Sequence, residues 1–184
     1  MPPPDFVTFS DLISEPERLE LHDNARLLMA KKQLQVNQAG PNRFFIRIWD
    51  TPMVTPLIEK VARRVETKFN LDDCPVDVDL GWVISVILPG GFIHSHTDAI
   101  SYAGRPYSHF RCNVVVARPE EGGTPIISGK PVPVMERGGW AFLASEHTHM
   151  ATAVEGQIPR IIYQFGYRVP ASWSLPVPVE EKVA

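Results

Sequence analysis

The sequence predicts a mainly β fold, a sandwich or jelly roll of the double-stranded β-helix type that cupins also use, with flanking helices on the N-terminal side. From residue 76 onward, short runs rich in β-branched and aromatic residues alternate with glycine and proline, which is typical of strands separated by turns. The 18 prolines and 12 glycines are numerous, but 44% of the residues are apolar, which excludes wholesale disorder. The expected strands cover residues 76–88, 92–96, 110–118, 124–128, 132–136, 140–144, 148–153 and 160–169.

The chain is expected to form a single domain over residues 1–184, because its length suits one hydrophobic core. We interpret residues 1–75 as an N-terminal support, 76–169 as the double-stranded β-helix core and 170–184 as a tail. The net charge of −3 provides no basic field for phosphate backbones, so no nucleic-acid partner is expected. No feature of the sequence indicates an oligomeric state.

Two features predict a cytoplasmic protein. The N-terminal segment has neither a basic start nor an apolar core, and no apolar run approaches the ~18 residues of a membrane-spanning helix. The two cysteines, Cys74 and Cys112, are too few for a disulfide framework and are interpreted as free thiols. We therefore expect a cytoplasmic localisation and no membrane partner.

Two helices are expected in the N-terminal part. The first begins at a cap formed by Ser10 or Ser14 and ends near Lys32. Its apolar side is expected to consist of Leu19, Ala25, Leu28 and Met29. A strand at 43–49 precedes a second helix that begins at Thr55. The apolar face of that helix is expected to consist of Leu57, Val61, Val65 and Phe69.

The most informative pattern in the sequence is a group of possible metal ligands. His96 and Asp98 are two residues apart, so on a strand their side chains leave the same face and can bind one ion. A third ligand, His149, would come from a distant strand. Two imidazoles and one carboxylate are typical of a mononuclear non-haem iron(II) site with open coordination positions.

Neighbouring histidines leave other ligand sets open. His94 and His96 with a third histidine would form an all-imidazole site, which suits zinc better. His147 and His149 share one strand face, so alternation alone does not separate them. His149 is favoured because an apolar strand, a glycine turn and then Arg160 follow it, and this hairpin can bring the arginine back beside the ligand to bind a carboxylate. A role for His147 at the metal stays open.

Polar residues on otherwise apolar strands predict a lined pocket. Arg160 shares a strand face with Ile162 and Gln164, and a buried arginine requires an acidic side chain or a bound carboxylate. Arg111 and Asn113 likewise share one face of the strand at 110–118. Two such strands suggest that these polar side chains line a common binding site.

Other residues are expected around the same pocket. Ser85 is the polar residue of an apolar run, and it is either a pocket hydroxyl or a core serine. His94 is interpreted as part of the pocket wall. A loop at 102–109, which contains Tyr107 and His109, is a candidate lid over the substrate.

Five motifs in a fixed order resemble the iron(II)- and 2-oxoglutarate-dependent dioxygenases. They are Pro-Gly-Gly-Phe-Ile-His-Ser-His-Thr-Asp at 89–98, Phe-Arg-Cys-Asn-Val-Val-Val at 110–116, Glu-Gly-Gly-Thr-Pro at 121–125, Gly-Trp-Ala-Phe at 139–142, and the stretch 149–160. Within that superfamily the set is most similar to the aspartyl/asparaginyl β-hydroxylase branch, over about residues 82–169.

The resemblance implies a role for each matched residue. It implies that His96, Asp98 and His149 bind Fe(II) as the catalytic centre, and that Arg160 pairs with the distal carboxylate of the cosubstrate 2-oxoglutarate. Asp98, retained here, would occupy the position that a halide needs in halogenating relatives, so hydroxylation is favoured over halogenation.

Further positions are assigned by the same resemblance. Ser85 and Asn113 fall where the branch holds 2-oxoglutarate, although the branch has histidine at the position of Asn113. Arg111 matches an arginine that contacts the substrate's carboxylate. Together with His94, Tyr107 and His109, which the pocket and loop patterns suggest, Arg111 makes up the expected substrate site.

The implied activity is hydroxylation of an unactivated C–H bond with O2, coupled to conversion of 2-oxoglutarate to succinate and CO2. The expected substrate is a small polar or amino-acid-like molecule, or a peptidyl side chain. The alternative is a non-oxidative metal-dependent cupin, an isomerase, epimerase or lyase, which would use the same ligands without needing Arg160. A binding module that has lost catalysis is a third reading, disfavoured by the complete ligand set.

Overall fold

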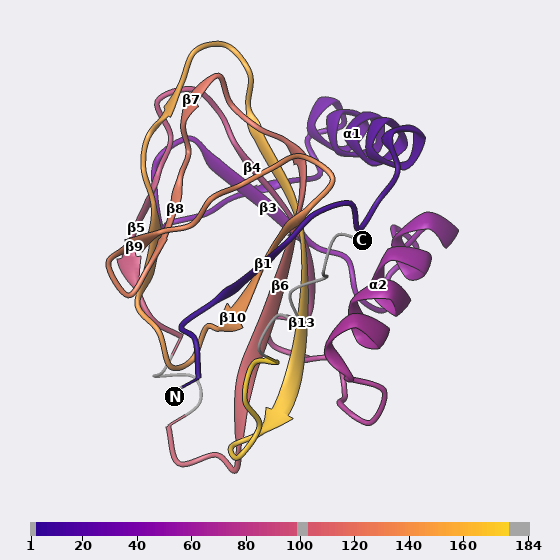
Figure 1. Cartoon of the computed structure of the whole chain (residues 1–184). Helices are drawn as coiled ribbons and strands as arrows, with labels where there is room; N and C mark the ends of the chain where they lie inside the picture. Colours follow the sequence, from indigo (N-terminus) through magenta and orange to yellow (C-terminus); the bar gives the residue numbers. More distant parts are fainter. Residues whose placement is uncertain (1–2, 99–102, 177–184) are drawn as a thin grey trace, which may run out of the picture.

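The computed structural model describes residues 3–98 and 103–176, and within them it confirms the predicted double-stranded β-helix. The large antiparallel sheet has the strand order β1 (Val7–Phe9), β10 (Gly139–Leu143), β6 (Tyr107–Ala117), β13 (Arg160–Pro170), β4 (Trp82–Ile87), β3 (Arg43–Arg47) and β2 (Gln35–Val36). The small sheet has the order β5 (Ile93–His96), β11 (His149–Ala151), β8 (Pro125–Ile127) and β9 (Lys130–Pro131), while β7 (Glu121–Gly122) pairs with β12 (Val154–Glu155). In Figure 1 the two helices lie to one side of the large sheet, and β5, β8 and β9 lie to the other.

The helix α1 (Glu15–Ala30) begins at Ser14, one of the two caps predicted for it. The Ser14 backbone N–H donates to Glu17 Oε2 at 2.9 Å, and the Glu17 backbone N–H donates to the Ser14 hydroxyl at 3.4 Å, which forms a capping box. The buried residues of this helix are Leu21, Ala25 and Leu28. The prediction that Leu19 belongs to the buried side was wrong, because Leu19 is 48% exposed. It lies two positions before the buried Leu21, and side chains two positions apart on a helix point in nearly opposite directions.

The helix α2 (Pro56–Phe69) begins after the predicted cap Thr55, and its predicted apolar face is confirmed. Its buried residues include Leu57, Val61, Val65 and Phe69. The Phe69 ring lies 5.1 Å from the ring of Phe110 in β6, so the helix packs on the outer face of the large sheet.

Alternating residues of β6 and β13 enter two separate cores. Phe110, Cys112, Val114 and Val116 of β6 pack toward the helices, whereas Val115 packs with Ile127, Trp140, Phe142 and Ile162 between the two sheets. The inward positions of β6 therefore include Arg111 and Asn113, and those of β13 include Arg160 and Gln164. The register sets Gln164 opposite Asn113. The shared faces predicted from alternation are confirmed.

Two predicted strands were wrong in part or in full. The strand expected at 76–88 begins only at Trp82, because Asp77 forms a turn: its Oδ1 accepts from the backbone N–H of Asp79 at 2.9 Å and of Leu80 at 3.3 Å. The segment 132–136 is not a strand. Prolines at 131 and 133 remove two backbone donors there, and pairing ends with β9.

The loop predicted at 102–109 is also shorter than expected. Strand β6 already begins at Tyr107, so Tyr107 and His109 belong to the large sheet. Tyr102 lies outside the described residues, as do residues 177–184 of the predicted tail. Among the described residues, neither helix is long and apolar enough to cross a membrane. Cys74 and Cys112 are free, as predicted.

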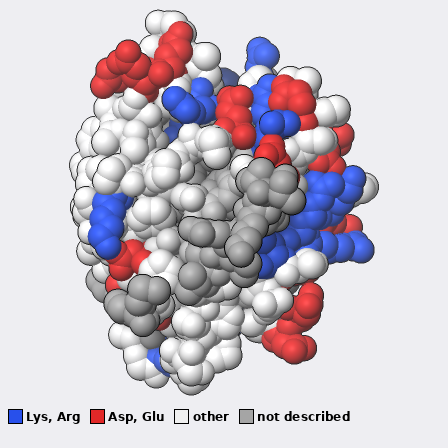
Figure 2. Space-filling view, viewed as in Figure 1, with Lys and Arg blue, Asp and Glu red and all other residues white. Residues whose placement is uncertain are grey.

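Basic side chains gather on the side of the molecule where α2 lies (Figure 2). Several of these charges are compensated by carboxylates. Arg64 and Lys60 both contact Glu17 of α1, at 2.7 and 2.9 Å, and Arg63 lies 3.6 Å from Glu59. The α2 surface is therefore a network of ion pairs that links the two helices.

Candidate metal centre

The two sheet-borne histidines of the predicted site face each other across one strand pair. His96 ends β5, His149 begins β11, and the register pairs them directly. Their ring centroids are 4.2 Å apart. The pairing shifts immediately after His149, and such bulges commonly re-aim side chains next to functional sites. Asp98 follows two residues after His96, and its backbone N–H donates to the carbonyl of Ala144 at 3.0 Å.

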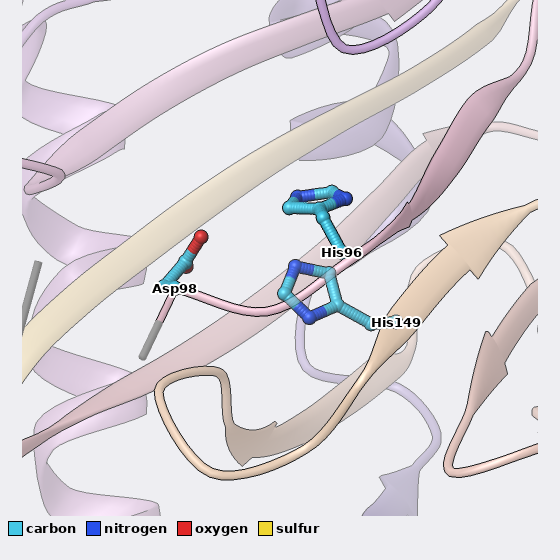
Figure 3. Close-up of side chains that lie close together, drawn as sticks. All are labelled: His96, Asp98 and His149. Carbon is cyan, nitrogen blue, oxygen red and sulfur yellow. The ribbon is translucent and has the colours of Figure 1, made fainter. Parts of the chain in front are cut away.

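His96, Asp98 and His149 form a group that could hold a metal ion. One ligand atom from each residue lies within 4.8 Å of the others. Figure 3 shows the two rings and the carboxylate turned toward a common point. The sequence left open which of the neighbouring histidines would bind a metal. The group contains His96 and His149, and neither His94 nor His147 belongs to it.

Those two neighbours instead supply backbone carbonyls to the group. His96 Nδ1 lies 2.7 Å from the carbonyl oxygen of His94, and His149 Nδ1 lies 3.0 Å from that of His147. Because a carbonyl only accepts, each Nδ1 must carry the hydrogen. In the neutral rings both Nε2 atoms therefore keep a lone pair for a cation, and the hydrogen bonds fix the ring orientations.

The electrostatic surroundings keep Asp98 and His149 in metal-binding protonation states. Burial acts to raise the pKa of the Asp98 carboxyl group, but Arg111 and the nearby histidines outweigh it, so the pKa lies below its ordinary value. Burial together with the charge of Arg111 lowers the pKa of His149 to about 3. At neutral pH the pair therefore offers a carboxylate and a neutral imidazole.

The guanidinium of Arg111 bridges two of the three ligands. Its Nη2 donates to Asp98 Oδ2 at 2.7 Å, and its Nη1 lies 3.5 Å from His149 Nε2. It is thus a cation beside the carboxylate that a metal ion would also contact. A metal ion entering the group would have to displace at least the contact between Arg111 and His149.

The donor set fits a divalent transition metal with open coordination positions. Two imidazole nitrogens and one carboxylate oxygen, grouped on one side, are the ligands of facial iron(II) sites. A structural zinc site would need a fourth protein ligand, and the group of described residues has three. The arrangement can therefore bind an ion and leave positions for small molecules.

A narrow cavity extends from the histidines along the inner face of the large sheet. It is lined by Arg43, Ile93, His96, Arg111, Asn113, Pro125, Ile127, Trp140, Phe142, His149, Met150, Arg160 and Gln164. Its free volume is about 30 Å³ with the side chains as they stand, so an organic ligand requires side chains such as Arg111 to move. The structure thus brings Arg111, Asn113 and Arg160 to one cavity with the two histidines.

Arg160 is the most unusual residue of this cavity. It is 4% exposed, its Nη1 has no hydrogen-bond partner among the described residues, and its guanidinium lies 5.4 Å from the Trp140 ring centroid. Burial, reinforced by the charge of Arg43, lowers the pKa of Arg160 to about 9, so it remains a cation at neutral pH. A buried cation with an unpaired donor is the feature that a carboxylate ligand would complete.

Asn113 and Ser85, the other two residues predicted to hold the cosubstrate, differ from Arg160 in their contacts and position. Asn113 Oδ1 accepts a hydrogen bond from Gln164 Nε2 at 2.8 Å, so its amide oxygen is already engaged. Ser85 is buried and lies in register with Ile162, but it is not among the described residues that line the cavity.

The remaining predicted substrate residues do not line the cavity. His94 is exposed and packs edge-on against Phe92, with ring centroids 4.8 Å apart. The Tyr107 hydroxyl accepts from Arg105 at 2.7 Å. His109 is fully buried, with Nδ1 3.0 Å from Asp77 Oδ2. Burial lowers the pKa of His109, so the neutral ring donates to Asp77.

Sequence reasoning missed Arg43. It begins β3 in the N-terminal part, outside the motif region, and it is 8% exposed in the cavity wall. Trp140, which we would otherwise assign to the core, also lines the cavity and contacts Arg160. The one available signal for Arg43 was its position as a charged residue at the start of the apolar run at 43–49.

Comparisons with known proteins find similarity in structure. No family model and no curated protein matches the chain. The viral collagen prolyl hydroxylase of Paramecium bursaria Chlorella virus-1, solved with 2-oxoglutarate, has a TM-score of 0.65 at 17% identity, over 90% of this chain and 97% of that one. HygX from Streptomyces hygroscopicus, solved with nickel and 2-oxoglutarate, has a TM-score of 0.65 at 12% identity, over 98% and 88%.

A third similar structure is the epimerase SnoN in complex with Fe3+, alpha ketoglutarate and nogalamycin RO. Its TM-score is 0.68 at 13% identity, and the match covers 96% of this chain and 92% of that one. Together these likenesses show that the chain has the double-stranded β-helix fold that these structures share.

Proposed function

We propose that the protein is an Fe(II)- and 2-oxoglutarate-dependent oxygenase that hydroxylates an unactivated C–H bond of a small polar or amino-acid-like substrate, or of a peptidyl side chain. The observation that carries the proposal is that the cavity beside the His96, Asp98 and His149 group is lined by both of its histidines and by Arg160, a buried arginine whose Nη1 has no hydrogen-bond partner among the described residues. A metal group alone would fit many metalloproteins. The buried guanidinium adds a requirement for an anion.

In this proposal the Nε2 atoms of His96 and His149 and one Asp98 oxygen would hold iron(II). Iron bound there would supply the activation of O2, with 2-oxoglutarate as the reductant that ends as succinate and CO2. The chain contributes orientation: the carbonyls of His94 and His147 hold each imidazole with Nε2 toward the ion.

Arg160 would bind the distal carboxylate of 2-oxoglutarate. Its buried Nη1 offers a donor without a partner among the described residues, and the Trp140 ring lies 5.4 Å from the guanidinium. Charge-assisted hydrogen bonds in such a site are stronger than those in water. Asn113 and Gln164, which are hydrogen-bonded to each other, would form the polar wall beside the ligand.

Similar structures support the type of chemistry but leave the reaction outcome to be measured. HygX, the viral prolyl hydroxylase and SnoN were all solved with 2-oxoglutarate (alpha ketoglutarate), but one of them is described as a hydroxylase and another, SnoN, as an epimerase. We propose hydroxylation, in the manner of the aspartyl/asparaginyl β-hydroxylase branch, because the sequence motifs resemble that branch. Epimerisation through the same metal site is the competing outcome, and product analysis distinguishes the two.

The proposal is tested by anaerobic titration of the iron(II)-loaded protein with 2-oxoglutarate, followed by visible absorption. Chelation of iron by the keto acid produces a charge-transfer band, and we expect it to saturate at one equivalent. A non-oxidative cupin would use the same ligands without needing Arg160. Iron binding without a band, and without any effect of 2-oxoglutarate, would favour that alternative.

A further inference from the structure

Arg43 and Arg160 both line the cavity, and they lie in register with each other across the large sheet. Strand β4 lies between β3 and β13, and its Ile87 is the register partner of both arginines. Residues in register across neighbouring strands leave the same face of a sheet. Two strand spacings separate the Cα atoms of the arginines by about 9–10 Å, a gap that two long side chains can close.

Both guanidinium groups are buried without a counter-ion. Arg43 is 8% exposed and its Nε has no hydrogen-bond partner among the described residues, as is the case for Nη1 of Arg160. Within residues 3–98 and 103–176, neither forms an ion pair with a carboxylate. The carboxylate that acts electrostatically on Arg43 is that of Asp98, which is already hydrogen-bonded to Arg111.

This arrangement is unfavourable for the ligand-free protein. The charge of Arg43 acts on Arg160, and burial, reinforced by the charge of Arg111, lowers the pKa of Arg43 to about 10. Like charges in a poorly hydrated space raise the free energy of the folded state unless an anion lies between them. Sites that bind ligands are commonly the places where a protein carries such unfavourable contacts.

Among the described residues, the Arg43 guanidinium forms one hydrogen bond, and this hydrogen bond orients it. Its Nη1 donates to Asn37 Oδ1 at 3.2 Å, and the same oxygen accepts from the backbone N–H of Ala39 at 2.8 Å. Asn37 therefore holds one side of the guanidinium while Nε remains without a partner. The cavity lining includes both Arg43 and Arg160.

We propose that Arg43 is the second guanidinium of a two-arginine carboxylate site, and that with Arg160 it makes the cavity select dicarboxylates over monocarboxylates. This inference rests on the proposed function, because it assigns the distal carboxylate of 2-oxoglutarate to the pair. A carboxylate has two oxygens that accept several hydrogen bonds, so one group can engage donors from both arginines. Asn37 is the positioning residue for Arg43.

A merely structural role for Arg43 makes the opposite stability prediction. If Arg43 served to pin the chain at Asn37, Arg43→Met would lower the melting temperature of the ligand-free protein. In a ligand site, Arg43→Met removes an unpaired buried charge and its repulsion from Arg160. The melting temperature should then rise, by ~2–4 °C for about 1 kcal/mol in a chain of this size.

The binding test is calorimetric titration of nickel-loaded protein with two probes. The first is 2-oxoglutarate, and the second is 2-oxovalerate, which keeps the keto acid but carries a methyl group in place of the distal carboxylate. We expect Arg43→Met to weaken 2-oxoglutarate binding about 10–100-fold and to change 2-oxovalerate binding by less than twofold. Arg47→Met, which removes an exposed arginine from the same strand, should leave both affinities unchanged.

The outcomes distinguish a failure of the role proposed for Arg43 from a failure of the proposed oxygenase function. Wild-type 2-oxoglutarate affinity in Arg43→Met, with loss in Arg160→Met, would overturn the role of Arg43 and leave the proposed function standing. Equal loss of both probes in Arg43→Met, with a lower melting temperature, would also overturn it. If Arg43→Met does not fold, Arg43→Lys keeps the charge and should lose affinity for 2-oxoglutarate alone. Wild-type protein that does not bind 2-oxoglutarate would remove both proposals.

Discussion

His96 and His149 are register partners across β5 and β11, with ring centroids 4.2 Å apart. The pairing of two short strands therefore brings together residues that are far apart in the sequence. Asp98 joins them because it follows two residues after His96, where its backbone N–H donates to the carbonyl of Ala144. Metal binding should depend on all three side chains.

Removing any ligand should abolish tight metal binding. His96→Ala, Asp98→Ala and His149→Ala each leave two donors, and we expect the affinity for iron(II) to fall about 100-fold or more, since changes to groups that only orient ligands already cost 10–100-fold. Anaerobic metal titration measures this. His22→Ala, an equivalent change on α1, serves as the control. Wild-type affinity in Asp98→Ala would exclude the carboxylate as a ligand.

Arg111→Met should strengthen metal binding. Its guanidinium lies 2.7 Å from Asp98 and repels an incoming cation, and its removal also leaves the metal-free carboxylate without a partner. Both effects favour the metal-bound state, so we expect iron(II) affinity to rise about tenfold. Arg137→Met, which removes a surface arginine paired with Asp11, is the matched control. A weaker affinity would mean that Arg111 supports the ligands instead of competing with the ion.

Arg160→Ala should chiefly raise the concentration of 2-oxoglutarate that turnover requires. Loss of a charge-assisted hydrogen bond in a buried site costs about 2–3 kcal/mol, which corresponds to roughly 30–150-fold in KM for 2-oxoglutarate. The kcat at saturation should fall much less, because the metal ligands are unchanged. Steady-state kinetics with varied 2-oxoglutarate separate the two parameters. An unchanged KM would place the distal carboxylate elsewhere.

Part of the stability at neutral pH should depend on Glu17 and should be lost as the pH falls. Its hydrogen bonds from Arg64, at 2.7 and 2.9 Å, hold the pKa of Glu17 far below its ordinary value of 4.5. A carboxyl group whose pKa is lower in the folded state stabilises the protein above about pH 4.5, and this contribution is lost as the pH falls. Glu17→Gln should therefore be destabilised by about 2 kcal/mol at pH 7, and the difference should shrink steadily toward pH 2.

Denaturant unfolding at several pH values measures that difference. Glu20→Gln, on the same helix, is the control, and its stability should follow that of the wild type. A difference between Glu17→Gln and wild type that does not vary with pH would show that the ion pair is not the origin of the effect.

The sequence predicted those features that depend on local pattern. Alternation along β6 and β13 assigned Arg111, Asn113, Arg160 and Gln164 to the inner face, and the register has them there. The caps at Ser14 and Thr55 followed from capping chemistry and proline tolerance. These features are determined by residues that are close together in the sequence.

Features that depend on tertiary pairing could not be predicted. Arg43 enters the cavity only because β3 lies beside β4, which the local sequence does not specify. His109 was expected in a loop, but it is buried in β6 because the facing Gly166 has no side chain to exclude its ring, and Asp77 accepts its hydrogen.

The most direct test of the account is a single-turnover measurement of succinate. Iron(II)-loaded protein is mixed anaerobically with one equivalent of 2-oxoglutarate, O2 is admitted, and succinate is quantified for wild type and Asp98→Ala. We predict succinate formation by the wild type and none above background for Asp98→Ala. Equal succinate from both proteins, or none from wild type that has bound iron and 2-oxoglutarate, would contradict the account.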